Sequence, residues 1–225
     1  MLTEATNVAL LYTASLGGRL ALLPKLMTRI RQERTGPTLL VDLGRACVEG
    51  AWICDATDGR GMLVAMDAMG YDAFHIGPGD ALYSQPALVE QMRGHIMTPF
   101  AAGPWSGVAR RSGVVFRFAA RFDVIPPNAE PADLTIALQF GKYPRADVEA
   151  DGERRMLTLD AGATGDEPLL GRLDMALLPE SPYIRIVSQA SLAIPDDLMP
   201  DPTISSVIEF VESEARFAER KRGPT

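Results

Sequence analysis

The sequence predicts an α/β protein in which two sheets pack together with helices outside them. Two observations support this fold class. The first hundred residues alternate short apolar runs with segments of helical periodicity, a pattern typical of parallel strands joined by helical crossovers. Beyond residue 110, short apolar runs follow one another with Gly and Pro between them, which indicates a strand-rich region.

The first half, about residues 7–100, contains three strand–helix repeats. In a parallel sheet of this kind the loops after the strands meet at one edge, where ligands bind. The loops 13–18, 44–50 and 77–83 are therefore the candidate functional site. The expected strands cover residues 8–12, 38–42 and 73–76, and the expected helices cover residues 22–30, 61–69 and 84–93.

The strand-rich second half, about residues 110–195, is followed by one more helix at about residues 203–220. Ile204, Val207, Ile208, Val211 and Ala215 form its apolar stripe. We expect residues 1–225 to form a single domain. The strands expected in this half cover residues 113–122, 134–140, 156–159, 170–178 and 184–193.

The composition excludes several classes of protein. A net charge of −7 argues against a nucleic-acid surface, because phosphate backbones attract basic patches. No apolar run approaches the ~20 residues of a membrane span. The N-terminus lacks the basic region of a signal peptide. We therefore expect a cytoplasmic protein with no membrane or nucleic-acid partner.

Cysteine and histidine are both scarce. Cys47 and Cys54 are expected to be two partly buried thiols, which meet only if the stretch between them is helical. A redox or metal role for them is the alternative. The only histidines are His75 and His95, and two imidazoles twenty residues apart cannot build a His-rich dinuclear metal centre.

The three candidate loops carry motifs that resemble a known family. Residues 11–20 read LYTASLGGRL, residues 39–45 read LLVDLGR, and residues 66–80 read MDAMGYDAFHIGPGD. In this order and spacing they resemble the motifs of 5′-nucleotidase-type calcineurin-like metallophosphoesterases. Residues 170–177, LGRLDMAL, and residues 194–202, IPDDLMPDP, are similar to the end of that domain. The resemblance covers about residues 7–215 and implies a four-layer α/β/β/α sandwich of two packed mixed sheets.

The departures from the family motifs bear on function. The resemblance implies two divalent metal ions held by Asp, His and Asn side chains, some of them in a late histidine segment. The stretch 140–160 is too short to contain that segment. The family also often carries a second domain, which we do not expect in a chain that ends at Thr225. The matching ligand positions hold Ser15, Gly17, Arg45, Pro78 and Gly79.

These replacements degrade the metal site. Glycine has no side chain, proline offers only a carbonyl, and serine is a weak ligand. Arg45 is worse than neutral because its guanidinium does not deprotonate in proteins. A fixed cation beside a metal ion is repelled by several kcal/mol at an effective dielectric of ~20. We therefore expect no bound metal cofactor.

The replaced pocket has two further interpretations. Arg45 and Arg19, with the backbone N–H groups of Gly17 and Gly18, could bind a phosphate or nucleotide without metal. Alternatively, Arg45 pairs with Asp42 or Asp80 and fills the pocket. A new one-metal carboxylate site is a weaker alternative, and it would use four acids: Asp42, Asp55, Asp58 and Asp80.

Three functions follow as hypotheses. The first is a catalytically inactive metallophosphoesterase-like protein that binds an unknown protein partner or a small anionic ligand. The second is a metal-dependent phosphohydrolase with a rebuilt site. The third is a metal-free phosphate or nucleotide sensor that uses Arg45 and Arg19.

Overall fold

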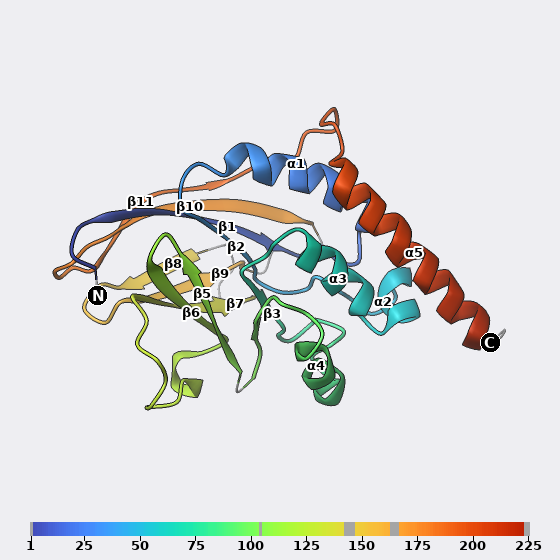
Figure 1. Cartoon of the computed structure of the whole chain (residues 1–225), viewed down its shortest axis with the longest axis horizontal. Helices are drawn as coiled ribbons and strands as arrows, with labels where there is room; N and C mark the ends of the chain where they lie inside the picture. Colours follow the sequence, from blue (N-terminus) through green and yellow to red (C-terminus); the bar gives the residue numbers. More distant parts are fainter. Residues whose placement is uncertain (1, 104, 142–146, 163–166, 223–225) are drawn as a thin grey trace.

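The computed structural model describes residues 2–103, 105–141, 147–162 and 167–222. Two mixed sheets pack face to face, and the α-helices lie outside the larger one (Figure 1). The six-stranded sheet has the order β11-β10-β1-β2-β3-β4, and the five-stranded sheet has the order β5-β6-β7-β9-β8. The expected α/β sandwich of two packed mixed sheets is therefore confirmed.

Most elements lie where the sequence places them. The strands of the larger sheet are β1 (Thr6–Ala14), β2 (Thr38–Asp42), β3 (Ala73–His75), β4 (Phe100–Ala101), β10 (Leu169–Leu177) and β11 (Ile184–Ser191). Those of the smaller sheet are β5 (Ser106–Arg111), β6 (Val114–Ala119), β7 (Leu134–Gln139), β8 (Asp147–Asp151) and β9 (Met156–Asp160). The helices are η1 (Leu20–Leu22), α1 (Leu23–Glu33), α2 (Trp52–Thr57), α3 (Arg60–Ala68), α4 (Pro86–Arg93), η2 (Phe122–Val124) and α5 (Pro202–Arg222).

Strands β1 to β4 are parallel, as the alternation of strands and helices predicts. The two late strands differ from the expected division into halves, because β10 pairs antiparallel with β1 and β11 extends the same sheet. Both sheets bury apolar strands, so hydrophobicity alone does not assign a strand to one of them. The β1–β10 pair depends on Gly171, where an added Cβ would lie 2.1 Å from Tyr12 Cζ.

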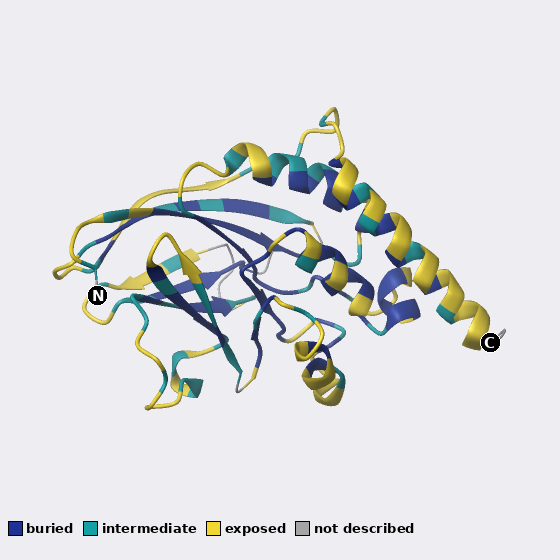
Figure 2. Ribbon diagram, in the orientation of Figure 1, coloured by how far each residue is buried: buried dark blue, intermediate teal, exposed yellow. Residues whose placement is uncertain are grey.

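Two apolar layers hold the fold together. One lies between the sheets, and the other lies between the larger sheet and the helices. Figure 2 shows this arrangement as buried strands beneath helices whose outer faces are exposed. The edge of the larger sheet where β1, β2 and β3 end is thus fixed from both sides by packed side chains.

The outer face of the five-stranded sheet is covered differently. The segment 120–133 borders this face, and Arg117 of β6 donates a hydrogen bond to the Glu130 carbonyl in it. In the described residues the segment forms only the short 3-10 helix η2, so the expected fourth layer contains no α-helix there. Pro126, Pro127 and Pro131 explain this, because proline cannot continue a helix.

Four short elements have no clear signal in the sequence. Helix α2 has six residues, and β4 has two. Strands β5 and β8 carry polar side chains on partly exposed edges, so their alternation is weak. In the described part of the chain, no helix combines the length and the apolar character that a membrane crossing requires.

Candidate functional site

The structure brings the three candidate loops together at the carboxyl edge of the larger sheet. Ser15 N donates to the Gly44 carbonyl at 3.0 Å, and Gly17 N donates to the Arg45 carbonyl at 2.9 Å. The third loop joins them through Ala81 N, which donates to the Cys47 carbonyl at 2.8 Å. The second loop is therefore held between the first and the third by main-chain hydrogen bonds.

Two side-chain-bearing residues at this edge have left-handed backbone. Ser15 has φ 55° and Arg45 has φ 57°. This conformation costs an L-residue about 1–2 kcal/mol and persists only where the surroundings impose it. The hydrogen bonds between the loops supply that constraint. The motif resemblance predicts that both residues replace metal ligands.

Four of the candidate residues line one cavity. Ser15, Gly17, Arg19 and Arg45 surround a space of about 460 Å³ together with Glu49 and its neighbours. Arg19 donates to the Ser15 carbonyl at 3.3 Å. Two arginines from different loops therefore share one cavity, and Glu49 also lines it.

The prediction that the backbone N–H groups of Gly17 and Gly18 bind an anion in this pocket is wrong. Gly17 N donates to the Arg45 carbonyl, and Gly18 N donates to the Ala46 carbonyl at 2.8 Å. These two N–H groups join the first loop to the second, so they do not point at a ligand. Of the anion-binding groups predicted from the sequence, only the side chains of Arg19 and Arg45 remain candidates.

The Arg45 side chain lies between the second and third loops. A Cβ added to Gly79 would lie 3.5 Å from Arg45 Cδ and 3.6 Å from Nε, so the arginine stem packs against this glycine. The guanidinium carbon lies 5.6 Å from the centroid of the Phe140 ring, within the range of a cation–π contact. The side chain therefore occupies the space into which a side chain at position 79 would extend.

The expected pairing of Arg45 with Asp42 or Asp80 is not formed; within the described residues, neither carboxylate lies within ion-pair distance of it. Asp42 instead accepts hydrogen bonds from Thr13 Oγ1 at 2.8 Å and from Gly44 N at 2.9 Å. Burial raises the pKa of Asp42 well above its usual value. Asp42 is therefore a structural group at the end of β2.

Asp80 holds the third loop to the second. It accepts from Leu82 N at 2.9 Å and from Cys47 N at 3.5 Å. Burial raises its pKa to about 6, although the backbone donors act in the opposite direction. The backbone turn at Pro78 and Gly79 precedes it, with Asp80 N donating to the Gly77 carbonyl at 3.1 Å.

A second cavity of about 460 Å³ beside the third loop is acidic, and its lining includes Glu49, Asp55, Asp58 and Asp80. Three of these acids are already engaged: Gly50 N donates to Asp55 at 3.2 Å, Arg222 pairs with Asp58 at 2.9 Å, and Asp80 accepts from Leu82 N and Cys47 N. Nowhere in the described residues do three or more His, Cys, Asp or Glu side chains form a group that could hold a metal ion. The donor set at this edge thus does not fit the two-metal centre of the resembled family. Residues 142–146, inside the stretch 140–160 where we expected no late histidine segment, lie outside the described residues.

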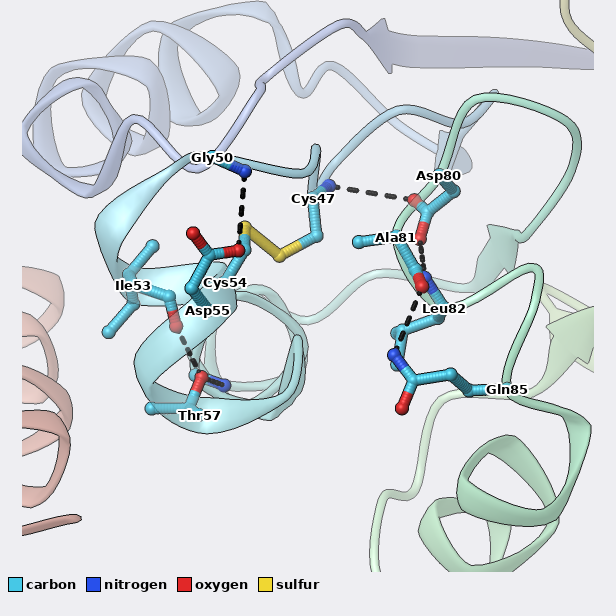
Figure 3. Close-up of a disulfide and its surroundings, with 11 residues drawn as sticks. Cys47, Gly50, Ile53, Cys54, Asp55, Thr57, Asp80, Ala81, Leu82 and Gln85 are labelled. Carbon is cyan, nitrogen blue, oxygen red and sulfur yellow. Dashed lines mark hydrogen bonds between the residues drawn. A yellow bond between two sulfur atoms is a disulfide. The ribbon is translucent and has the colours of Figure 1, made fainter. Parts of the chain in front are cut away.

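The two cysteines form a disulfide, which corrects the expectation of two separate thiols. Figure 3 shows that this bond joins the second loop to α2. The prediction that the cysteines meet only if the stretch between them is helical was also wrong, because α2 begins only at Trp52 and most of that stretch is a loop. A turn through Gly50 brings the cysteines together, with their Cα atoms 5.7 Å apart.

His75 lies beside the candidate edge but does not face the cavities. Its Nδ1 lies 2.9 Å from the Ala101 carbonyl, and burial lowers its pKa. An added Cβ at Gly77 would lie 2.4 Å from its Nε2, so the ring is enclosed by the following loop. His75 is therefore a packed and hydrogen-bonded residue of β3.

Two residues of the site were missed. Phe140 follows β7 and reaches Arg45 from the other sheet, and Glu49 lines both cavities. Neither lies in a recognisable motif. The contact of Phe140 depends on how the two sheets pack, which no local pattern reveals, whereas Glu49 lies within the candidate loop 44–50.

The comparisons with known proteins identify the fold. No protein-family model matches the sequence, and no curated protein matches it. Among solved structures, NAD nucleotidase (NadN) of Haemophilus influenzae has a TM-score of 0.65 at 8% identity, over 95% of this chain and 61% of that one. Calcineurin-like phosphoesterase YfkN of Bacillus subtilis has a TM-score of 0.62 at 12% identity, over 96% and 99% of the two chains.

A 5′-nucleotidase precursor of Thermus thermophilus gives a similar result, with a TM-score of 0.64 at 11% identity over 94% of this chain. The chain spans only 61% and 59% of the two nucleotidases that it matches. At these identities the likeness shows the fold alone. That fold is the 5′-nucleotidase-type calcineurin-like domain that the loop motifs indicate.

Proposed function

We propose that this metallophosphoesterase-like chain does not hydrolyse phosphoesters and acts as a binding or interaction module. The observation that carries the proposal is the position of Arg45. Its stem packs on Gly79, at a position where the resembled family has a metal ligand. A permanent cation thus stands between two loops that would both have to supply ligands.

The surrounding donor set supports the same conclusion. Two divalent ions in one pocket need several anionic or imidazole ligands to offset their repulsion and lost hydration. The three loops offer Ser15, two glycines, Pro78 and a cation at those positions. Because the replacements are spread over all three loops, no one substitution restores the site.

Metal analysis combined with a hydrolysis assay tests this proposal. The purified chain, incubated with Mn²⁺, Zn²⁺ or Fe²⁺, is assayed for bound metal and for activity on bis-p-nitrophenyl phosphate and AMP. We expect no stoichiometric metal and no activity above the buffer rate. Arg45→Ala is the matched variant. If the wild type shows activity and Arg45→Ala shows the same activity, that activity does not arise in this cavity. Two metals per chain, with an activity that the variant alters, would establish the phosphohydrolase alternative.

A second candidate is a metal-free phosphate or nucleotide sensor. The observation that favours it is the single cavity shared by Arg19 and Arg45. Inorganic phosphate and AMP should then raise the melting temperature beyond what chloride does at equal ionic strength. Arg45→Ala should abolish this shift, whereas Arg121→Ala, at an exposed arginine just before η2, should keep it. If phosphate and AMP leave the wild-type melting temperature unchanged, the sensor hypothesis fails.

A further inference from the structure

An exposed apolar surface runs along α5 and α3, away from the motif loops. Helix α5 lies across the outside of the molecule and packs against α1, α3 and α2 (Figure 1). Its inner face is buried through Ile204, Ile208, Val211 and Ala215. The outer face nevertheless exposes two large aromatic side chains, Phe210 at 61% and Phe217 at 58%.

This surface is grooved. A cavity of about 770 Å³ lies where the N-terminal half of α5 meets the end of α3, and Asp67 lies in its wall. A second cavity, of about 350 Å³, lies further along α5 where Arg60 of α3 and Lys221 approach it. Phe210 and Val64 border both cavities. We call this surface the α3–α5 groove.

Its charges change sign from one end to the other. Asp67 lies at the end near the start of α5, and Arg60 and Lys221 lie at the other end. Of the charged residues of α5, Glu214 and Lys221 line the groove, whereas Arg216 pairs with Glu212 and Arg222 pairs with Asp58. An antiparallel copy of α5 therefore brings its Lys221 toward the Asp67 end of the groove and its Glu214 toward Arg60.

The apolar features are complementary in the same arrangement. An antiparallel pair of α5 helices related by a two-fold axis near residue 214 places Phe210 of one copy beside Phe217 of the other. Each copy contributes two aromatic side chains and two cavities, which a self-complementary contact requires. Glu214 of each copy then lies near the axis, where Arg60 of the other copy offsets its charge.

We propose that the α3–α5 groove is the surface through which two copies of this chain associate, with their α5 helices antiparallel. The occupant is a second copy because Lys221 and Glu214 of an antiparallel α5 are opposite in charge to Asp67 and Arg60 of the groove, and because each copy exposes the same two phenylalanines. Exposed aromatic side chains at the centre of such a contact carry much of the association energy. The contact does not depend on whether the motif loops bind a ligand.

Sedimentation of the full chain over a concentration range up to about 1 mM tests the proposal, since that limit detects even weak association. We expect a monomer–dimer equilibrium in the wild type. Phe217→Ser should raise the dissociation constant at least tenfold, because the substituted side chain occurs twice in a symmetric contact. Val187→Ser on β11 is the matched control, since Val187 is 62% exposed and lies on another surface.

A charge exchange tests the orientation of the helices. Glu214→Arg alone and Arg60→Glu alone should each weaken the dimer, and the double variant should restore it. Both residues are exposed, so these changes leave the fold intact as judged by circular dichroism. A wild type that remains monomeric overturns the proposal. A dimer that persists in Phe217→Ser, or that dissociates in Val187→Ser, also overturns it.

Discussion

Asp80 gives the structure its sharpest pH-dependent prediction. The residue is 6% exposed, and its carboxylate accepts from Leu82 N and Cys47 N, so it joins the third loop to the second. Asp80→Asn removes the ionisable group and keeps a side chain of the same shape. The amide oxygen can still accept the shorter bond from Leu82. The substitution therefore isolates the effect of charge at this buried position.

The magnitude follows from the pKa. Burial raises the pKa of Asp80 from 3.8 to about 6 in the folded protein. The folded chain then binds this proton more tightly than the unfolded chain, so the contribution of Asp80 to stability is greatest below about pH 4. It is lost as the pH rises through about 6. A difference of about two pKa units corresponds to about 3 kcal/mol at 1.36 kcal/mol per unit.

Urea unfolding of the wild type and of Asp80→Asn, from pH 4 to pH 8, measures this effect. We expect the variant to gain up to about 3 kcal/mol over the wild type across this range, starting within about 1 kcal/mol of it at pH 4. The other buried acids titrate in both proteins, so they largely cancel in the difference. Asp197→Asn, at an exposed carboxylate, is the control. A difference between Asp80→Asn and the wild type that does not change with pH would refute the reasoning.

Three further predictions concern the scaffold. Cys54→Ser should lower the free energy of unfolding by about 2–3 kcal/mol in urea, as expected for a short disulfide loop, and a thiol reductant should lower only that of the wild type. Gly171→Ala should cost about 1–3 kcal/mol because the new methyl group collides with the buried Tyr12 ring; an unchanged melting temperature would mean that β1 and β10 pair in another register. Asp201→Ala should cost about 1 kcal/mol by thermal unfolding, because its carboxylate accepts from Ile204 N at the start of α5; no loss would contradict this capping role.

The parts of the fold that could be predicted are those with a local cause. The strand at residues 38–42 coincides with β2 because four apolar or β-branched residues in a row, before Asp42, have no helical period. The helix expected at 203–220 is found at Pro202–Arg222, since its apolar stripe repeats every three to four residues. What could not be predicted is the sheet that β10 and β11 join. The partner of β10 is β1, more than a hundred residues earlier in the sequence, and β11 joins the same sheet by pairing with β10.

The candidate site shows the same division. The motif loops are brought together because parallel strands end at one edge, which a sequence pattern can indicate. The hydrogen-bond partners of Arg45 and of the Gly17 and Gly18 N–H groups depend on residues with left-handed backbone, which turn the loops toward one another. These turns determine which N–H groups form hydrogen bonds within the protein. A motif therefore predicts where a residue lies, but it does not predict the hydrogen bonds of its main chain.

The same hydrogen bonds explain how the edge can keep its shape without metal ligands. In the described residues the three loops are joined through Ser15 N to Gly44, Gly17 N to Arg45 and Ala81 N to Cys47, and the disulfide adds a covalent link to α2. Removal of divalent ions with EDTA should therefore leave the melting temperature within about 1 °C of its original value. A metal present at a hundred times its Kd would contribute about 2.7 kcal/mol, and a domain of this size loses about 2–4 °C per kcal/mol. A fall of about 5–10 °C on chelation, reversed by Mn²⁺ or Zn²⁺, would show that metals hold this edge and that the replaced ligand positions have been compensated elsewhere.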